Sequence, residues 1–129
     1  MSVFTFPYDV RYNPSMPVVQ VELGAPGRDL LPRRLSALID SGSDGTLVPI
    51  NVLEEAGARC VGEARLRGVT GPSQLVNVYL ANLQVGTHLV CGVRVVAAPE
   101  QSEFILGRNT LNHLVVTLNG LAGVTEILA

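Results

Sequence analysis

The sequence predicts an all-β domain with one or two short helices, and three observations support this prediction. The chain has 13 glycines and 8 prolines in 129 residues, and many of them separate apolar runs, as turns require. Valines recur in short runs that alternate apolar with polar residues, a pattern typical of strands. Few stretches show the 3.6-residue period of an amphipathic helix. The length fits a single domain.

The first part of the chain is predicted to be an arm followed by two strands. Residues 1–17 combine prolines with aromatic residues, which indicates an extended arm that packs on the body of the domain. Val18–Leu23 alternates and is typical of a strand with one polar face. Residues 24–32 form a loop rich in Gly and Pro, and Leu35–Ile39 is the next predicted strand.

The middle of the chain predicts a short helix and then a hairpin. Ile50–Ala58 can form a helix that Gly57 ends. Cys60–Arg67 and Leu75–Val85 both alternate, and glycines bracket the short segment between them. This arrangement predicts two strands joined by a glycine-bracketed turn.

The last part of the chain predicts more strands around a helical turn. Leu89–Ala97 is a further strand, and Phe104–Leu106 is a short strand that is apolar throughout. Arg108–His113 can form a helical turn. Val115–Leu118 and Val124–Leu128 bracket the sequence NGLAG and are predicted to close the domain as a hairpin.

Composition and charge exclude several classes of partner. The formal net charge of −2 gives no electrostatic footprint for nucleic acid or for an anionic membrane. No run approaches the roughly 20 apolar residues that a spanning helix needs. The first residues lack a basic start and a long apolar run, so we expect no signal peptide and a cytoplasmic protein.

Cys60 and Cys91 are too few for a disulfide framework, and we expect buried, reduced thiols.

A carboxylate at the end of a predicted strand is the candidate for chemistry. In "ALIDSGSDGT", residues 37–46, an apolar strand leads directly into Asp40 and a turn of small residues. Backbone N–H groups in such a turn favour the charged carboxylate, whereas burial or a second negative charge disfavours it. Two carboxylates that face each other would share one proton, so that one activates water and the other acts as an acid. The alternative is that Asp40 is a solvated turn residue.

The second carboxylate of such a pair is not found elsewhere in the chain. Asp44 lies beyond the turn on the same segment, so it points away from Asp40. Asp9 lies in the predicted arm and Asp29 in the predicted loop. A homodimer with its two-fold axis at Asp40 would supply the missing group.

At this point the sequence resembles the retropepsin-like aspartic protease family. "ALIDSGSDGTLVP" is similar to the active-site stretch of that family, and "FILGRNTLNHL", residues 104–114, is similar to its second hallmark near the C-terminus. "LRGVTGPSQL", residues 66–75, falls where the family has its flap. The resemblance covers residues 18–129 and leaves 1–17 as an N-terminal arm. It implies a closed β-barrel of the acid protease fold, with a flap hairpin and one short C-terminal helix.

The resemblance also implies an activity and a role for the residues around Asp40. The protein would be an aspartic endopeptidase, a homodimer that acts on peptide or protein substrates with no cofactor and no metal. Asp40 would be the catalytic carboxylate. Ser41 and Gly42 would form the rigid turn, with Ser41 bonding across the dimer axis and Gly42 offering its backbone to the substrate. Ser43 could donate a hydrogen bond to the Asp40 carboxylate and so shift the activity optimum toward acid.

The remaining implied roles concern the support of this turn and the flap. Asp44 would pair with Arg108 near the dimer interface. Gly107 would let an apolar strand pass close beneath the turn, and Asn109 would open the C-terminal helix together with Arg108. The residues of the flap and its substrate contacts would be Gly68, Val69, Thr70 and Gly71.

Other motifs lack the companions that their chemistry needs. His88 and His113 have no Cys or acidic residue at ligand spacing. The serines around Asp40 lack a nucleophile elbow and an evident base, and the glycines lack the Lys of a phosphate loop. The rival function is a dimeric binding or assembly module of the same fold with little catalysis. The flap lacks an aromatic residue, which favours this rival, whereas the retained Asp40 disfavours it.

Overall fold

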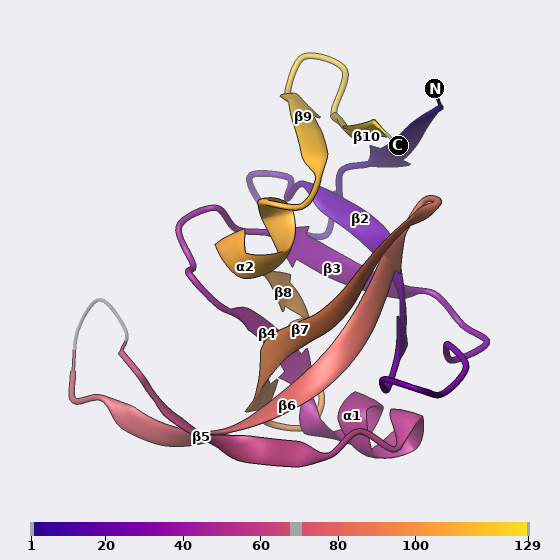
Figure 1. Cartoon of the computed structure of the whole chain (residues 1–129). Coiled ribbons are helices and arrows are strands. Elements are labelled where there is room, and N and C mark those ends of the chain that lie inside the picture. The colour runs from indigo at the N-terminus through magenta and orange to yellow at the C-terminus, as the bar shows by residue number, and fades with distance from the viewer. Residues whose placement is uncertain (1, 68–70, 129) are drawn as a thin grey trace.

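A computed structural model describes residues 2–67 and 71–128, and its main feature is a closed β-barrel (Figure 1). The strands follow one another around the barrel until β6 pairs again with β2. In spatial order they are β2 (Val18–Gly24), β3 (Leu35–Ile39), β8 (Ile105–Leu106), β4 (Thr46–Pro49), β7 (His88–Ala98) and β6 (Gln74–Val85). The fold therefore matches the predicted all-β barrel.

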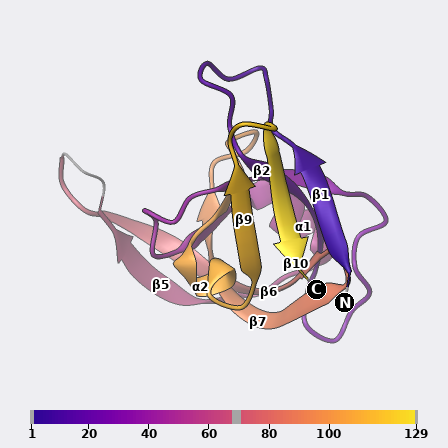
Figure 2. The same cartoon turned by 90° about the horizontal axis from the view of Figure 1, so that it is seen from above.

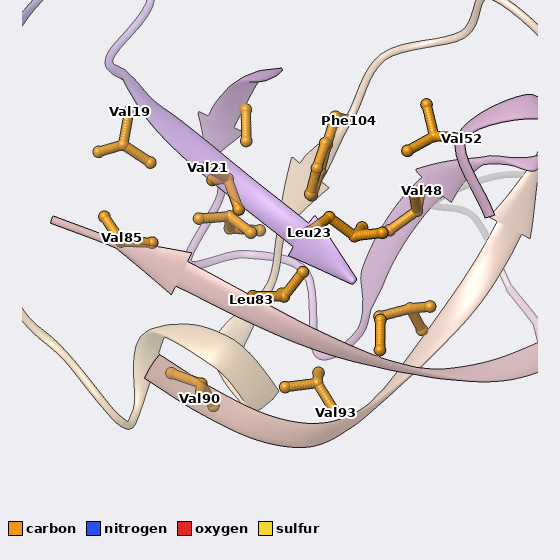
Figure 3. Packing of buried hydrophobic residues seen from close by; sticks show 14 of the residues in the cluster. Val19, Val21, Leu23, Val48, Val52, Leu83, Val85, Val90, Val93 and Phe104 are labelled. Carbon is orange, nitrogen blue, oxygen red and sulfur yellow. The ribbon is translucent and has the colours of Figure 1, made fainter. Parts of the chain in front are cut away.

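Alternating apolar residues of these strands fill the interior of the barrel. In β2, Val19, Val21 and Leu23 are fully buried, while Gln20 and Glu22 between them are partly exposed. Figure 3 shows the two valines and Leu23 in one buried cluster with apolar side chains from β6, β7 and α1. β-Branched side chains suit this environment because they pack well on a pleated surface.

A hairpin that includes the predicted flap extends from one side of the barrel. β5 (Cys60–Leu66) pairs with the first half of β6 outside the closed barrel, and the two strands project away from it (Figure 1). Both strands lie within a residue or so of their predicted bounds. Of the four predicted flap residues, Gly68, Val69 and Thr70 lie outside the described residues. Gly71 has a φ of 96°, a backbone conformation that favours glycine.

A second sheet of three strands lies at one end of the barrel. β1 (Val3–Pro7) pairs with β10 (Val124–Leu128), which pairs in turn with β9 (Val115–Asn119), and Figure 2 shows the three side by side. The sequence predicts β9 and β10 but not β1, which lies within the arm. The ring of Phe4 packs over the turn at Gly86, where an added Cβ would lie 2.6 Å from the ring.

Two short helices complete the fold, and both begin where they are predicted. α1 (Ile50–Ala56) ends at Gly57, whose φ of 72° is left-handed. α2 (Arg108–Leu111) follows β8 directly. No helix in the described part of the chain is long and apolar enough to cross a membrane.

The prediction of buried thiols is wrong, because Cys60 and Cys91 are both exposed. Cys60 opens β5, whose alternate residues face solvent outside the barrel, and Cys91 lies on an outward position of β7.

Candidate active site

The turn that carries Asp40 is built on the adjacent strand β8. β3 runs parallel to β8, and the Asp40 backbone N–H continues this pairing by donating to the Leu106 carbonyl at 3.1 Å. The Gly42 N–H donates to Asp40 Oδ1 at 3.0 Å, and the Ser43 N–H donates to the Asp40 carbonyl at 3.2 Å. The Asp40 side chain is exposed and has a defined direction at the end of an apolar strand.

The start of α2 fixes the rest of this turn through main-chain groups. The Arg108 N–H donates to the Ser43 carbonyl at 2.8 Å, and the Asn109 N–H donates to the Asp44 carbonyl at 3.3 Å. The Arg108 guanidinium reaches over the turn and donates to the Ser41 carbonyl at 2.7 Å. The two stretches that the sequence identifies, residues 37–49 and 104–114, therefore lie against each other.

Gly107 is the point of closest approach between these stretches. A Cβ at this position would overlap the Gly45 carbonyl group and lie 2.9 Å from the Ser43 carbonyl oxygen. The φ of Gly107 is −91°, a value that other residues adopt, so the constraint is space and not backbone conformation. The expected close passage of an apolar strand beneath the turn is confirmed.

A buried hydroxyl beneath the turn is a feature that sequence reasoning missed. Thr46 is fully buried on β4 and has three hydrogen-bond partners. Its Oγ1 lies 2.7 Å from Asn109 Oδ1 and 2.7 Å from the hydroxyl of buried Thr110, and it accepts from the Gly107 N–H at 3.2 Å. Since the Asn109 carbonyl oxygen only accepts, Thr46 donates to it and Thr110 donates to Thr46.

The same network reaches β7, the strand that pairs with β4. Asn109 Nδ2 donates to the Arg94 carbonyl on β7 at 2.8 Å. Asn109 therefore lies at the start of α2, as predicted. Its side chain supports the turn through contacts with Thr46 and with β7. A threonine among apolar neighbours in "TLVP" is the one sequence signal that could have pointed to this network.

Two predicted contacts of the turn are wrong in this structure. In the described residues, ion pairs join Arg11 to Asp9 and Arg33 to Glu55, and none joins Asp44 to Arg108. The Arg108 N–H is fixed on the Ser43 carbonyl, and this placement directs its guanidinium to Ser41. The Ser43 hydroxyl donates to the Gly45 carbonyl at 2.7 Å and not to Asp40.

A groove lies between this turn and the loop end of the β5–β6 hairpin. Its volume is about 380 Å³. Ser43, Leu47 and Ile105 line it from the barrel side. The hairpin side contributes Leu66, Arg67, Pro72 and Gln74. An extended chain of mixed polarity can lie in such a groove.

A second hollow, of about 270 Å³, lies on the other side of the turn. It is lined by Ile39 and Ser41, by Leu111 and Leu114 around α2, and by Val116 and Leu118 of β9. Leu118 is 53% exposed. The hollow is therefore mainly apolar and begins next to Asp40. No group of His, Cys, Asp and Glu in the described residues could hold a metal ion.

Comparisons with known proteins agree with this geometry. A family model described as aspartyl protease matches residues 19–110. A retropepsin-like aspartic protease from Rickettsia conorii has a similar structure, with a TM-score of 0.61 and 8% identity over 98% of this chain and 91% of that one. A foamy viral protease–reverse transcriptase in complex with an RNA/DNA hybrid gives a TM-score of 0.57 and 21% identity over 75% of this chain. The match spans only 12% of the viral protein. No curated protein matches the chain.

Proposed function

The chain belongs to the retropepsin-like aspartyl protease family, and from this premise we propose that it is an aspartic endopeptidase whose active site forms only in a homodimer. The observation that carries the proposal is a single exposed carboxylate, Asp40, held in a fixed direction by its own turn and by β8. Asp29 lies in the loop after β2, and Asp44 lies four residues after Asp40 on the same segment. Asp9 is paired with Arg11.

The proposed mechanism uses two Asp40 carboxylates, one from each subunit, and a water molecule. Two carboxylates in contact share a proton because both cannot ionise at close range. The ionised group removes a proton from the water as the water oxygen attacks the peptide carbonyl. The protonated group gives its proton to the carbonyl oxygen. The tetrahedral intermediate then collapses as the ionised carboxylate takes a proton from one of its hydroxyl groups. The other carboxyl gives the proton that it took from water to the nitrogen, the C–N bond breaks, and the amine leaves.

The support around Asp40 fits this task. Ser41 would bond across the two-fold axis, and the Gly42 backbone would face the substrate. Their geometry is preorganised, because main-chain hydrogen bonds from α2 and β8 hold the turn before any substrate binds. The groove of about 380 Å³ would hold one side of an extended peptide, with Leu47, Leu66 and Ile105 contacting apolar side chains.

The surface next to Asp40 supports the second copy as a partner. β9 lies at one edge of the three-stranded sheet, so its outer main-chain groups are available for pairing. The apolar hollow beside it includes Ser41 and Leu118. A two-fold contact here would bury this hollow and bring the two Asp40 turns together.

Replacement of Asp40 by Asn tests the proposal. We expect the variant to lose peptide cleavage completely while it keeps its dimer, since an amide can take the place of the carboxylate in the turn but cannot act as a base. Cleavage is measured with a peptide library at pH values of about 3 to 8, which span the carboxylate range. Sedimentation at several concentrations gives the oligomeric state.

The outcomes separate the enzyme from its rival. Full activity of the Asp40→Asn variant would refute the mechanism. A wild-type chain that dimerises and binds peptides without cleaving them would support the rival binding or assembly module. A chain that cleaves peptides as a monomer would overturn the shared site.

A further inference from the structure

A pocket of about 320 Å³ lies at the end of the molecule that carries α1 and β5. Figure 1 shows α1 and β5 at the opposite end of the barrel from α2, which adjoins the Asp40 turn. None of the residues that line the pocket lines the groove or the hollow beside Asp40. The lining residues are Ala25, Pro26, Gly27, Arg28, Gly57, Arg59, Val61 and Leu80.

Two arginines give the pocket a positive charge that the described residues do not neutralise. Arg28 and Arg59 both line it, and no carboxylate does. The ion pairs within residues 2–67 and 71–128 involve Arg11 and Arg33 instead. The Arg28 guanidinium lies over Gly57, where an added Cβ would be 2.8 Å from Nη1.

The C-terminal end of α1 offsets only part of the positive charge of the pocket. Helix C-termini carry a partial negative charge of roughly half a unit, which favours one nearby cation. Arg28 takes that place above Gly57. Arg59 follows two residues later and brings a second guanidinium to the same pocket, where no carboxylate of the described residues lines the wall. An external anion could pair with both guanidinium groups.

The remaining walls of the pocket are apolar. Ala25 is buried, with 4% of its surface exposed, and forms part of the interior end. Val61 is 45% exposed although it is a large apolar side chain on β5. Pro26 and Leu80 complete the apolar lining. Pockets that bind small groups specifically combine such walls with a few polar anchors, in volumes from about 300 Å³ upward.

We propose that this pocket binds the C-terminal residue of a peptide that ends in an apolar side chain. The α-carboxylate would pair with Arg28 and Arg59, because a guanidinium can donate two parallel hydrogen bonds to a carboxylate. The apolar side chain would contact Ala25, Val61 and Leu80. This site is independent of the proposed peptidase activity, since it shares no residue with the Asp40 turn.

Binding of three small probes to the full chain tests the proposal. N-Acetyl-leucine carries both the carboxylate and the apolar side chain, N-acetyl-leucine amide lacks the charge, and inorganic phosphate lacks the apolar part. Titrations are followed by the backbone amide signals of Gly27, Gly57 and Val61. We expect N-acetyl-leucine to shift these signals saturably and to bind most tightly of the three.

Matched variants locate the binding. Arg28→Gln and Arg59→Gln should each weaken N-acetyl-leucine binding by about tenfold or more, since each removes a charged hydrogen-bond donor. Arg33→Gln is the control, because Arg33 pairs with Glu55 and does not line the pocket. All three substitutions lie on exposed residues, so the fold should persist.

Several results would overturn the proposal. Equal binding of the amide would show that the arginines do not recognise a carboxylate. Tighter binding of phosphate would exclude the apolar contact, and an equal loss in Arg33→Gln would show a general effect of charge. An absence of saturable shifts with N-acetyl-leucine would remove the site altogether.

Discussion

The Asp40 turn and the N-terminal arm are both irregular segments laid on the barrel, but they are held in different ways. The turn, residues 40–45, is fixed by main-chain hydrogen bonds to Leu106–Asn109 and by the buried hydroxyl of Thr46 below. The segment 8–17 of the arm is held by main-chain hydrogen bonds at its two ends, where the Tyr8 N–H donates to the Gly123 carbonyl and the Pro17 carbonyl accepts from the Ile39 N–H. Between these ends, side chains at the surface add further contacts. Asp9 pairs with Arg11, and the Tyr12 hydroxyl donates to the Glu103 carboxylate.

These two kinds of support predict a rigid Asp40 turn and an arm that opens more easily. Buried hydrogen bonds are costly to break because the groups that lose their partners find no water. Exposed ion pairs contribute about 0–1 kcal/mol and are screened by salt. In the proposed dimer, a carboxylate that meets its copy needs the first kind of support, whereas an arm that covers a surface can use the second.

The largest effect is expected for Gly107→Ala. The new methyl group would overlap the Gly45 carbonyl, and main-chain atoms cannot move aside as a flexible side chain can. We expect a loss of about 3 kcal/mol or more in the free energy of unfolding, or a displaced Asp40 turn with no activity. Chemical denaturation measures the first result and peptide cleavage the second.

Gly45→Ala is the matched control, because Gly45 is the residue whose carbonyl group contacts Gly107. A Cβ on Gly45 meets no atom within 4 Å, and its φ is not in the left-handed region. This variant should stay close to the wild type in stability. If Gly107→Ala were equally well tolerated, the close packing of the two stretches would not constrain the site.

A smaller effect is expected for Thr46→Val, which keeps the shape and removes the hydroxyl. The Gly107 N–H, the Asn109 carbonyl and the Thr110 hydroxyl would lose their common partner inside the barrel. We expect a loss of about 1–3 kcal/mol in stability together with a fall in kcat. Thr46→Ser keeps the hydroxyl and should restore kcat more fully than stability.

Thr125→Val provides the comparison for Thr46. Thr125 is also fully buried, but its hydroxyl finds no partner among the described residues. Its replacement by Val should be neutral or slightly stabilising, because an unpaired hydroxyl is costly to bury. Equal losses of stability at the two positions would show that the hydrogen bonds of Thr46 contribute nothing beyond the packing of its side chain.

Much of this architecture could be predicted from the sequence, and the failures have physical causes. Val18–Gly24 alternates so regularly that it could hardly be other than a strand, and Gly57 ends α1 as expected. β1 was missed because its strand character comes from pairing with β10, more than a hundred residues away in the chain. Such long-range pairing leaves only a weak trace in a five-residue segment.

The candidate site shows the same limit at the scale of side chains. Asp40 was proposed because it follows an apolar strand, and Gly107 because residues 104–114 resemble the second hallmark of the family. The predicted Asp44–Arg108 pair failed because attraction between charges says nothing about direction. Main-chain hydrogen bonds fix the position of α2. That position directs the Arg108 guanidinium to the Ser41 carbonyl. The role of Thr46 depends on three partners that only the fold brings together.

In the arm, Tyr12→Phe is expected to have a small and local effect. The substitution removes the hydrogen bond to Glu103 and leaves the ring in place. We expect a stability loss of no more than about 1 kcal/mol and faster hydrogen exchange at the Asp9 and Met16 amides, which pair with each other in the arm. Activity should not change, and Tyr8→Phe is the control because the Tyr8 hydroxyl makes no hydrogen bond within residues 2–67 and 71–128. A loss of activity in Tyr12→Phe would connect the arm to the Asp40 turn.

The smallest effect is the response of the arm to acid. Side-chain hydrogen bonds from Arg11, followed by its backbone N–H, lower the pKa of Asp9 from 3.8 to about 2. Because this pKa is lower in the folded state, the pair stabilises the arm fully above the unfolded value of 3.8, and this contribution is lost as the pH falls toward 2. The Arg11 amide donates to Asp9 Oδ1 at 3.0 Å, so its protection against exchange, relative to the unstructured chain at the same pH, should fall between these two values. The amides of Asp40 and Arg108 should stay protected for longer, since main-chain carbonyls and not carboxylates accept their hydrogen bonds. Asp9→Asn should remove the acid response of the arm, and an unchanged response in that variant would assign it to another group.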